Sequence, residues 1–237
     1  MKITTFHRQT QLSKRRHQHM ARTTTQKKLY RDYIKRLLDI VFALTLLIIA
    51  LPIALIIAIF IKLDSKGPVI FRHKRCGRYS KPFVFYKFRS MHTHAPSEMP
   101  TREASEKSHI TRVGRILRKL SLDEIPQLWN VLRGDMSVIG PRPVVCSETS
   151  LIRRRAKNGA DQLRPGITGW AQVCGRDLLG PAKKARLDAE YAARVSFGFD
   201  IYCLVMTIWA VVTMHGHSEG SSDDHKVDTD KTSSSKK

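Results

Sequence analysis

The sequence predicts an α+β fold in which a membrane-inserted helix near the N-terminus precedes a small, mostly helical domain with short strands. Residues 40–61 form an apolar run without a charged side chain, long enough to enter a lipid bilayer. Runs at 69–71 and 83–86 are rich in β-branched and aromatic residues and indicate short strands. Apolar residues recur with helical spacing at 113–120, which indicates an amphipathic helix.

We expect four segments along the 237 residues: a flexible basic arm at 1–36, a membrane-inserted helix at 37–62, one soluble domain at 63–215 and a disordered tail at 216–237. Most of the arm and all of the tail lack apolar periodicity, so neither can bury enough surface to fold alone. With 42% hydrophobic residues, the remaining length suffices for one buried core.

The charge balance is strongly basic, with 42 lysine and arginine residues against 20 acidic ones and a formal net charge of +22. This predicts attraction to polyanions: nucleic acid, anionic lipid headgroups or phosphorylated substrates. No helix-turn-helix, zinc-finger or stacking-aromatic pattern occurs, so nucleic acid is not the expected partner. The four cysteines are scattered without a CxxC pair, which favours reduced thiols in a cytosolic compartment over disulfides or a zinc site.

The apolar run Ile40–Ile61 would measure roughly 33 Å as a straight helix, enough to cross a hydrocarbon core of roughly 30 Å. It is too long for a signal peptide, and no small-residue cleavage site follows it. Pro52 near its middle removes a helix hydrogen bond. Basic residues flank both ends, whereas a spanning helix carries its basic excess on the cytoplasmic side only. We predict a re-entrant helix bent at Pro52; the alternative is a spanning helix with a tolerated kink.

Two helical segments of the soluble part are candidates for the membrane surface. The segment 113–120 is apolar on one side and carries Arg112, Arg115, Arg118 and Lys119 on the other. It fits an interfacial helix, and equally a basic solvated face over a protein core. The apolar stretch 201–214 is too short to span a bilayer and is expected to be a core helix or an interfacial one.

The adjacent carboxylates Asp123 and Glu124 are the main chemical signal, because acidic residues are scarce in this chain. Arg118 and Arg142 flank them in the sequence. Carboxylates can act as nucleophiles and can hold Mg²⁺, while arginines bind phosphates bidentately. The alternative is a helix start, where acidic residues are favoured by the helix dipole.

The segment after the acidic pair predicts a short helix that starts at Pro126 and ends before Gly134. Asp123 and Glu124 would then lie in the turn ahead of it. A competing placement makes Ser121 the N-cap and Glu124 its capping-box partner, but Pro126 would fit less well inside that helix. Further on, 140–143 and 164–169 are Pro/Gly turns that each present one arginine. The histidines at 92, 94 and 109 are not expected to bind metal.

In order along the chain, several blocks closely resemble the bacterial sugar transferase family, the monotopic phosphoglycosyl transferases. The blocks run from about residue 31 to residue 214 and include Lys35–Asp39, Ile61–Pro68, Tyr86–Met91, Leu122–Ser137, Gly140–Pro143 and Arg164–Val173. The resemblance implies that residues 63–215 are a catalytic domain transferring a sugar-1-phosphate from a UDP-sugar to polyprenyl (undecaprenyl) phosphate, with release of UMP. This is the first membrane step of polysaccharide or glycan assembly.

The resemblance also implies roles for particular residues. Asp123 would be the nucleophile that forms a covalent aspartyl-phosphosugar intermediate, and Glu124 would be the ligand of a Mg²⁺ cofactor. Phosphate clamps are expected at Arg118 and Arg142, with Lys87, Arg89 and Arg164 as further candidates. The chain departs from the family at Leu51, where a serine often precedes the helix-breaking proline, and at Cys174, where the family often has asparagine.

The expected location is the cytoplasmic face of the bacterial inner membrane, where anionic lipid attracts the basic chain and soluble donor meets lipid acceptor. Glycosyltransferases that extend the product could be further partners. Two other hypotheses remain: an inactive membrane scaffold of the same fold, and a membrane-tethered nucleic-acid binder. Intact acidic residues at 123 and 124 argue against the scaffold, and steep salt dependence with sequence preference would be needed for the nucleic-acid binder.

Overall fold

The computed structural model describes residues 28–93, 109–175 and 179–213. Most of the predicted N-terminal arm, the predicted C-terminal tail and His94 lie outside these residues. The described part mixes helices with two small sheets, which confirms the α+β expectation.

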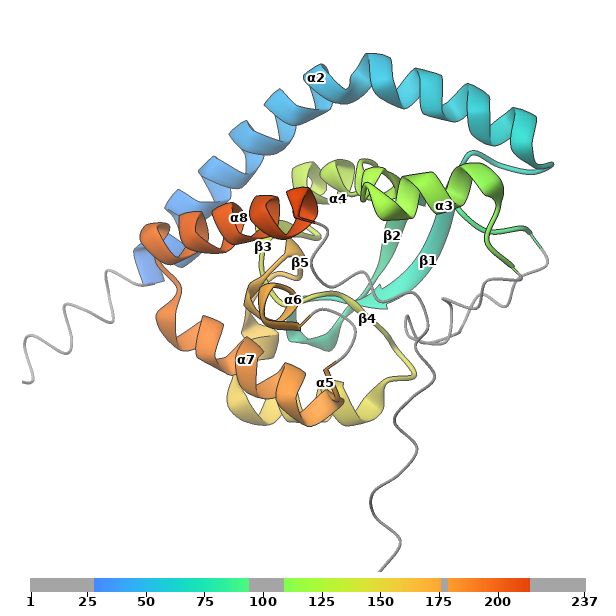
Figure 1. Cartoon of the computed structure of the whole chain (residues 1–237). Helices are drawn as coiled ribbons and strands as arrows, with labels where there is room; N and C mark the ends of the chain where they lie inside the picture. Colours follow the sequence, from blue (N-terminus) through green and yellow to red (C-terminus); the bar gives the residue numbers. More distant parts are fainter. Residues whose placement is uncertain (1–27, 94–108, 176–178, 214–237) are drawn as a thin grey trace, which may run out of the picture.

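The apolar segment forms α2, a continuous helix from Lys35 to Asp64 that extends a short π-helix at Tyr30–Ile34. By length and composition the combined helix could cross a membrane. Pro52 lies inside it, and Figure 1 shows α2 arched over the rest of the molecule. Ala43 and Ile61 are buried near its two ends, whereas Ile48 is 65% exposed near its middle. Leu47 and Ala54, on either side of the middle, are partly buried against the two core clusters. One face of α2 therefore lies along the domain, while side chains such as Ile48 are exposed.

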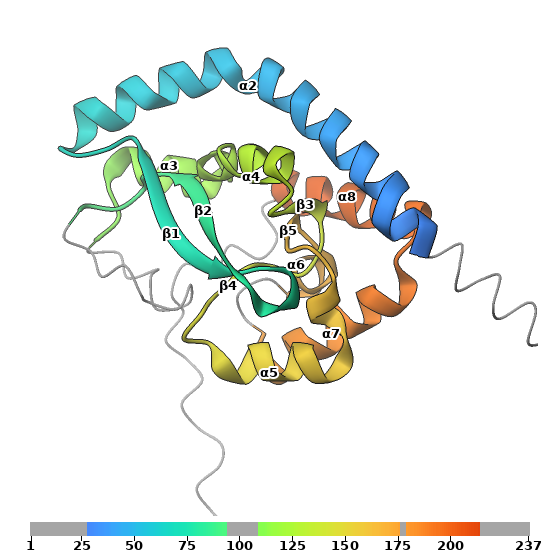
Figure 2. The same cartoon turned by 180° about the vertical axis from the view of Figure 1, so that it is seen from behind.

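A hairpin and a short third strand form the larger sheet. Strands β1 (Ile70–Cys76) and β2 (Pro82–Phe88) are antiparallel, and β4 (Val144–Val145) pairs with the other edge of β1. The two predicted strands are thus confirmed and are longer than the sequence indicated. Figure 2 shows α3 (Arg112–Lys119) and α4 (Gln127–Arg133) between this hairpin and α2.

The acidic pair lies where the preferred sequence placement put it. Pro126 directly precedes α4, and Gly134 ends that helix in the left-handed conformation with φ 90°. Asp123 and Glu124 belong to a short 3-10 turn just ahead of α4. The competing capping box does not form, because the Ser121 side chain makes no capping hydrogen bond.

The second sheet is a parallel pair of short strands, β3 (Ser137–Ile139) and β5 (Gly166–Thr168). Just after β3, the backbone at Gly140 lies very close to the segment that leads into β5. A Cβ on Gly140 would lie 2.4 Å from the backbone oxygen of Arg164. Glycine is therefore required there on steric grounds. The helices that follow are α5 (Thr149–Asn158), α6 (Trp170–Gly175), α7 (Pro181–Arg194) and α8 (Phe197–Val212).

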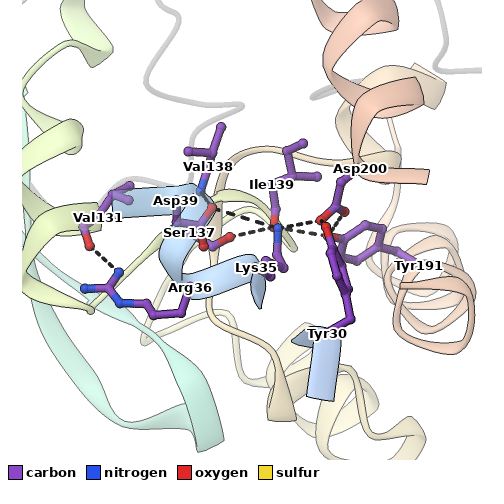
Figure 3. Close-up of polar contacts among 10 residues, drawn as sticks. All are labelled: Tyr30, Lys35, Arg36, Asp39, Val131, Ser137, Val138, Ile139, Tyr191 and Asp200. Carbon is purple, nitrogen blue, oxygen red and sulfur yellow. Dashed lines mark hydrogen bonds and ion pairs between the residues drawn. The ribbon is translucent and has the colours of Figure 1, made fainter. Parts of the chain in front are cut away.

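A buried polar cluster joins the start of α2 to the domain, and we call its five residues the α2 clamp: Tyr30, Lys35, Asp39, Tyr191 and Asp200 (Figure 3). The Lys35 ammonium lies 2.8 Å from Asp200, whose same oxygen accepts the Tyr30 hydroxyl at 2.7 Å.

The Asp200 carboxylate also accepts a hydrogen bond from the Tyr191 hydroxyl. Asp39 accepts the Val138 backbone N–H at 3.0 Å, which ties α2 to β3. These bonds satisfy buried charges and fix where α2 meets the domain.

Candidate active site

The backbone that carries the acidic pair has an unusual conformation. Ser121 adopts a left-handed conformation with φ 56°, which few residues other than glycine adopt readily. This reverses the chain after α3 and starts the turn Leu122–Glu124. Strained backbone of this kind is frequent at functional sites. The local geometry thus places two neighbouring carboxylates between α3 and α4.

The two carboxylates have different surroundings. Asp123 is 8% exposed, and among the described residues no hydrogen bond holds its carboxylate. Glu124 is fixed by Arg142, whose Nη2 lies 3.2 Å from Glu124 Oε1. Burial raises the pKa of Glu124 and the nearby Asp123 charge adds to that rise, while Arg142 opposes it. The site therefore has one anchored carboxylate and one without a fixed partner.

Lys87 on β2 faces the same region. Burial lowers its pKa to about 8; the charges of Asp123 and Glu124 oppose the shift, whereas Arg118 and Arg75 add to it. The lysine therefore lies within electrostatic range of both carboxylates. The Lys87 ammonium also lies 5.4 Å from the centre of the Phe71 ring. This cation–π contact stabilises the charged form of the lysine on the hairpin.

Arg142 lies in the turn between β3 and β4, and a second ion pair holds that turn. Arg155 on α5 donates from Nη1 to the Arg142 carbonyl oxygen at 2.9 Å. The same guanidinium contacts Asp188 on α7 at 2.8 Å, and both side chains are buried. Burial raises the pKa of Asp188, and Arg155 opposes this rise. Arg155 and Asp188 thus position Arg142, a role that sequence reasoning did not identify.

Arg118 lies at the end of α3, just before the acidic turn. Its Nε donates to the Ser90 hydroxyl at 3.1 Å and its Nη2 lies 3.2 Å from the Met91 sulfur. These contacts orient its guanidinium along the end of β2, and its charge acts on Lys87. Arg142 thus contacts Glu124, and Lys87 lies within electrostatic range of both carboxylates and of Arg118. Phosphate binding by these three residues stays a prediction.

The other two predicted phosphate-binding residues, Arg89 and Arg164, contact backbone oxygens away from the acidic pair. Arg89 is buried and donates to the backbone oxygens of Ser65 at 2.6 Å and Lys66 at 3.0 Å, where it completes the end of α2. Arg164 donates to the Gly134 oxygen at 3.1 Å, and burial, Arg78 and Arg36 lower its pKa. The structure does not bring either guanidinium into contact with the acidic pair.

The donor set suits a magnesium ion that is shared with a substrate. Mg²⁺ prefers oxygen ligands and is commonly held by one or two carboxylates together with substrate phosphates. Asp123 and Glu124 supply such oxygens. Burial, together with the nearby Asp123 charge, raises the pKa of Glu124, and a cation would oppose that rise. No cluster of three or more acidic, histidine or cysteine side chains arranged for a metal occurs in the described ranges. The residues therefore fit Mg²⁺ completed by phosphate oxygens, and Glu124 as its ligand stays a prediction.

Comparison with known proteins finds similarity to sugar transferases. A family model described as bacterial sugar transferase matches residues 30–214. The uncharacterized sugar transferase EpsL of Bacillus subtilis (strain 168) is 38% identical over 183 residues, a match that covers 77% of this chain and 89% of that protein.

Two further relatives carry names that state a reaction, UDP-glucose:undecaprenyl-phosphate glucose-1-phosphate transferase. The protein from Caulobacter vibrioides is 39% identical over 191 residues, covering 77% of this chain and 71% of the relative. The protein from Escherichia coli (strain K12) is 39% identical over 183 residues, covering 74% of this chain but only 39% of the relative. The matched region is thus most of the shorter relatives and a minor part of the longer one.

Proposed function

This chain belongs to the bacterial sugar transferase family, and on that premise we propose that it transfers a sugar-1-phosphate from a UDP-sugar to undecaprenyl phosphate and releases UMP. The names of the relatives from Caulobacter vibrioides and Escherichia coli support this donor class and this acceptor. The observation that carries the proposal is the acidic pair, in which Glu124 is anchored by Arg142 and the buried Asp123 has no hydrogen-bond partner among the described residues.

In the first proposed step, a carboxylate oxygen of Asp123 attacks the phosphorus that bears the sugar. A new O–P bond forms, the phosphoanhydride bond breaks, and UMP leaves with the electron pair. In the second step, a phosphate oxygen of undecaprenyl phosphate attacks the same phosphorus. The Asp123–phosphorus bond then breaks, which restores the carboxylate and yields the lipid diphosphate sugar. Covalent catalysis of this kind divides one difficult transfer into two easier ones.

The cationic side chains explain how an anion can attack an anionic diphosphate. Arg142 pairs with Glu124, and Lys87 lies within electrostatic range of both carboxylates and of Arg118. These three cations would neutralise phosphate charge as it approaches. A guanidinium carries five N–H donors in a fixed fork, so Arg142 can bridge Glu124 to a phosphate. Bound phosphate would also raise the pKa of Lys87 and so keep this lysine protonated.

We propose that Mg²⁺ is the cofactor, held by Glu124 together with diphosphate oxygens. When bound, the ion would offset the negative charge of the diphosphate and of the acidic pair. Asp123 then needs no hydrogen bond of its own, since its task is to reach phosphorus while its neighbour is held in place.

The membrane arrangement is a second part of the proposal. Helix α2 would enter the bilayer with both ends at the cytoplasmic face, because basic residues flank both ends of its apolar run and buried residues near both ends pack against one domain. Helices α3 and α8 lie on the same side of the molecule as α2 and would rest at the interface. The described apolar side chains of α8 that face outward are Phe197, Ile201, Tyr202, Val205, Ile208, Trp209 and Val212. A site beside α3 would then meet both soluble donor and lipid phosphate, and anionic lipid would attract the basic chain.

The reaction is tested by UMP release from detergent-solubilised protein with Mg²⁺, undecaprenyl phosphate and separate UDP-sugars: glucose, galactose and the N-acetylated forms. We expect UMP from one or a few donors, and loss of release in Asp123→Asn. Asp161→Asn, a carboxylate in a separate turn at Ala160–Gln162, serves as the matched control and should keep its activity. Equal release from Asp123→Asn would remove this residue as nucleophile, and no release from any donor would favour an inactive scaffold.

The membrane arrangement is tested with single cysteines at Tyr33 and Leu63, two exposed positions near opposite ends of the helix. Each is placed in a chain whose native cysteines are replaced by serine, and is labelled with a membrane-impermeant maleimide in inside-out vesicles and in spheroplasts. Labelling of both positions in inside-out vesicles alone is expected. Opposite sidedness would show a spanning helix with a proline kink.

A further inference from the structure

Two cysteines that lie far apart in the sequence meet at the edge of the larger sheet. Cys76 is the last residue of β1, and Cys146 follows β4 directly. The pairing of Cys76 with Val144 brings the two chain segments together. The sulfur atoms are 2.9 Å apart across a sequence separation of 70 residues, and Cys146 is exposed to solvent.

We propose that Cys76 and Cys146 are a reversible dithiol–disulfide pair, a modification site that peroxide oxidants address. A disulfide needs its sulfur atoms at roughly 2.05 Å, so the gap must close by less than about 1 Å. Both residues sit where two paired strands end, so a small movement of the turn after β4 is enough. No other pair of cysteines in the described part of the chain has its sulfurs in contact.

The oxidation can be written with its atoms balanced. The Cys146 thiolate attacks an oxygen of hydrogen peroxide, which gives a sulfenic acid on Cys146 and, after protonation, one water. Cys76 then loses its proton and attacks that sulfur; the S–S bond forms and hydroxide leaves as a second water. Two thiols and one peroxide thus give one disulfide and two waters. A low-molecular-weight dithiol reverses the change by exchange.

The surroundings assign the two sulfurs different tasks. Cys146 is exposed and can meet the oxidant first, whereas Cys76 is partly buried against Val144 and Ile152. Burial and the neighbouring Cys146 raise the pKa of Cys76 to about 12, and Arg155 opposes that rise. A thiol with a raised pKa is a poor first nucleophile, but it can still attack a sulfenic acid that lies in contact with it.

The cross-link would enclose the candidate active site in a covalent loop. Lys87, Asp123, Glu124 and Arg142 all lie between the two cysteines in the sequence. The disulfide would hold β4 against β1 and so restrain the turn that carries Arg142. Closing a loop of this length restricts the unfolded chain, so the oxidised protein should unfold at a higher temperature than the reduced one.

The test is peptide mass spectrometry of the full-length protein in detergent after a short treatment with hydrogen peroxide and alkylation of the remaining thiols. We expect one cross-linked species that joins the peptides containing Cys76 and Cys146, two hydrogens lighter than their sum and lost after dithiothreitol. Cys146→Ser and Cys76→Ser should each abolish it.

Cys174→Ser is the matched control, because Cys174 is also exposed and lies outside this pair. This variant should form the cross-link to the same extent as the unmodified chain and show the same rise in melting temperature on oxidation. Stable sulfinic acid on Cys146 without a cross-link would overturn the proposal, as would cross-links that involve Cys174 as often as Cys76. Neither readout requires transferase activity, so the result stands apart from the proposed reaction.

Discussion

The α2 clamp and the candidate active site are both clusters of carboxylates and cations, the first largely buried and the second partly exposed, and their hydrogen bonds are completed in different ways. In the clamp, Asp200 accepts hydrogen bonds on both oxygens, from Lys35 and Tyr30 on one and from Tyr191 on the other. In the site, Glu124 has Arg142, whereas Asp123 has no hydrogen bond from the described residues. A satisfied cluster fixes structure, and an incomplete one has oxygens available for a ligand or for bond formation.

This contrast is tested most severely by removing one carboxylate charge from each cluster. Asp123→Asn should lower UMP release by about a thousandfold or more, as expected for loss of a nucleophile, while leaving the melting temperature unchanged or raised. Asp200→Asn should instead destabilise the protein by about 3 kcal/mol, since it removes the closer of the two carboxylates paired with the buried Lys35 and leaves Asp39 at 3.9 Å. The measurements are initial rates of UMP release and thermal unfolding in detergent. Comparable destabilisation by both substitutions would contradict the distinction.

Replacing the arginine that anchors Glu124 should cost the next largest amount of activity. Arg142→Gln removes both the ion pair with Glu124 and the proposed phosphate contact. We therefore expect kcat/KM for the donor to fall by about a hundredfold. Arg142→Lys should restore only part of this, because lysine cannot reproduce bidentate recognition. Arg154→Gln, an exposed arginine of α5, is the control and should leave the rate unchanged. Full activity in Arg142→Lys would show that charge alone suffices.

The pH dependence of the reaction should report Lys87. Its pKa is lowered to about 8, so the free enzyme loses this cation as pH rises through that value. We expect kcat/KM for the donor to fall above about pH 8 in the unmodified chain and to stay flat there in Lys87→Met, from a lower starting value. Rates measured from pH 6.5 to 10 in parallel would show this, and an identical alkaline fall in Lys87→Met would assign it to another group.

The contribution of Lys87 to the free energy of unfolding should rise with pH, whereas its contribution to activity falls. The folded pKa of Lys87 lies below its unfolded value of roughly 10.4, so the folded state releases its proton first. The unfolded chain then holds more protons between about pH 8 and 10.4, and the contribution of Lys87 to stability rises with pH across that window. Denaturant titrations should show this rise reduced in Lys87→Met.

The smallest expected effect is that of replacing Arg164, which does not contact the acidic pair. Arg164→Gln removes a hydrogen bond to the Gly134 carbonyl. The free energy of unfolding should therefore fall by about 1 kcal/mol. UMP release should change less than about twofold. The same kinetic assay tests this; a large fall in kcat/KM with unchanged stability would place Arg164 among the phosphate ligands.

Local sequence signals predicted the elements whose structure is decided locally. Pro126 and Gly134 bound α4 because proline suits a helix start and glycine a left-handed end. The strands of the hairpin followed from runs of β-branched and aromatic residues, and helix α3 from helical spacing. The adjacent acids could be recognised as exceptional because so few carboxylates occur in this basic chain.

Contacts between distant segments could not be predicted in the same way. Arg155 and Asp188 are 33 residues apart, and Lys35 and Asp200 are 165 apart, so each pair depends on the complete packing of the helices. Arg142 and Arg164 have nearly the same local signal, an arginine in a Pro/Gly turn, yet one guanidinium meets Glu124 and the other meets Gly134. Turn chemistry fixes the backbone there, and only tertiary structure decides where the side chain goes.

The central claim is that Asp123, the carboxylate without a fixed partner, forms the covalent bond to the transferred phosphate. Its most direct test is the intact mass of the protein incubated with Mg²⁺ and the donor UDP-sugar in the absence of undecaprenyl phosphate. We predict an added sugar phosphate that maps to Asp123, that Asp123→Asn does not acquire, and that undecaprenyl phosphate discharges. Turnover without an adduct under rapid quenching, or an adduct on another residue, would contradict the account.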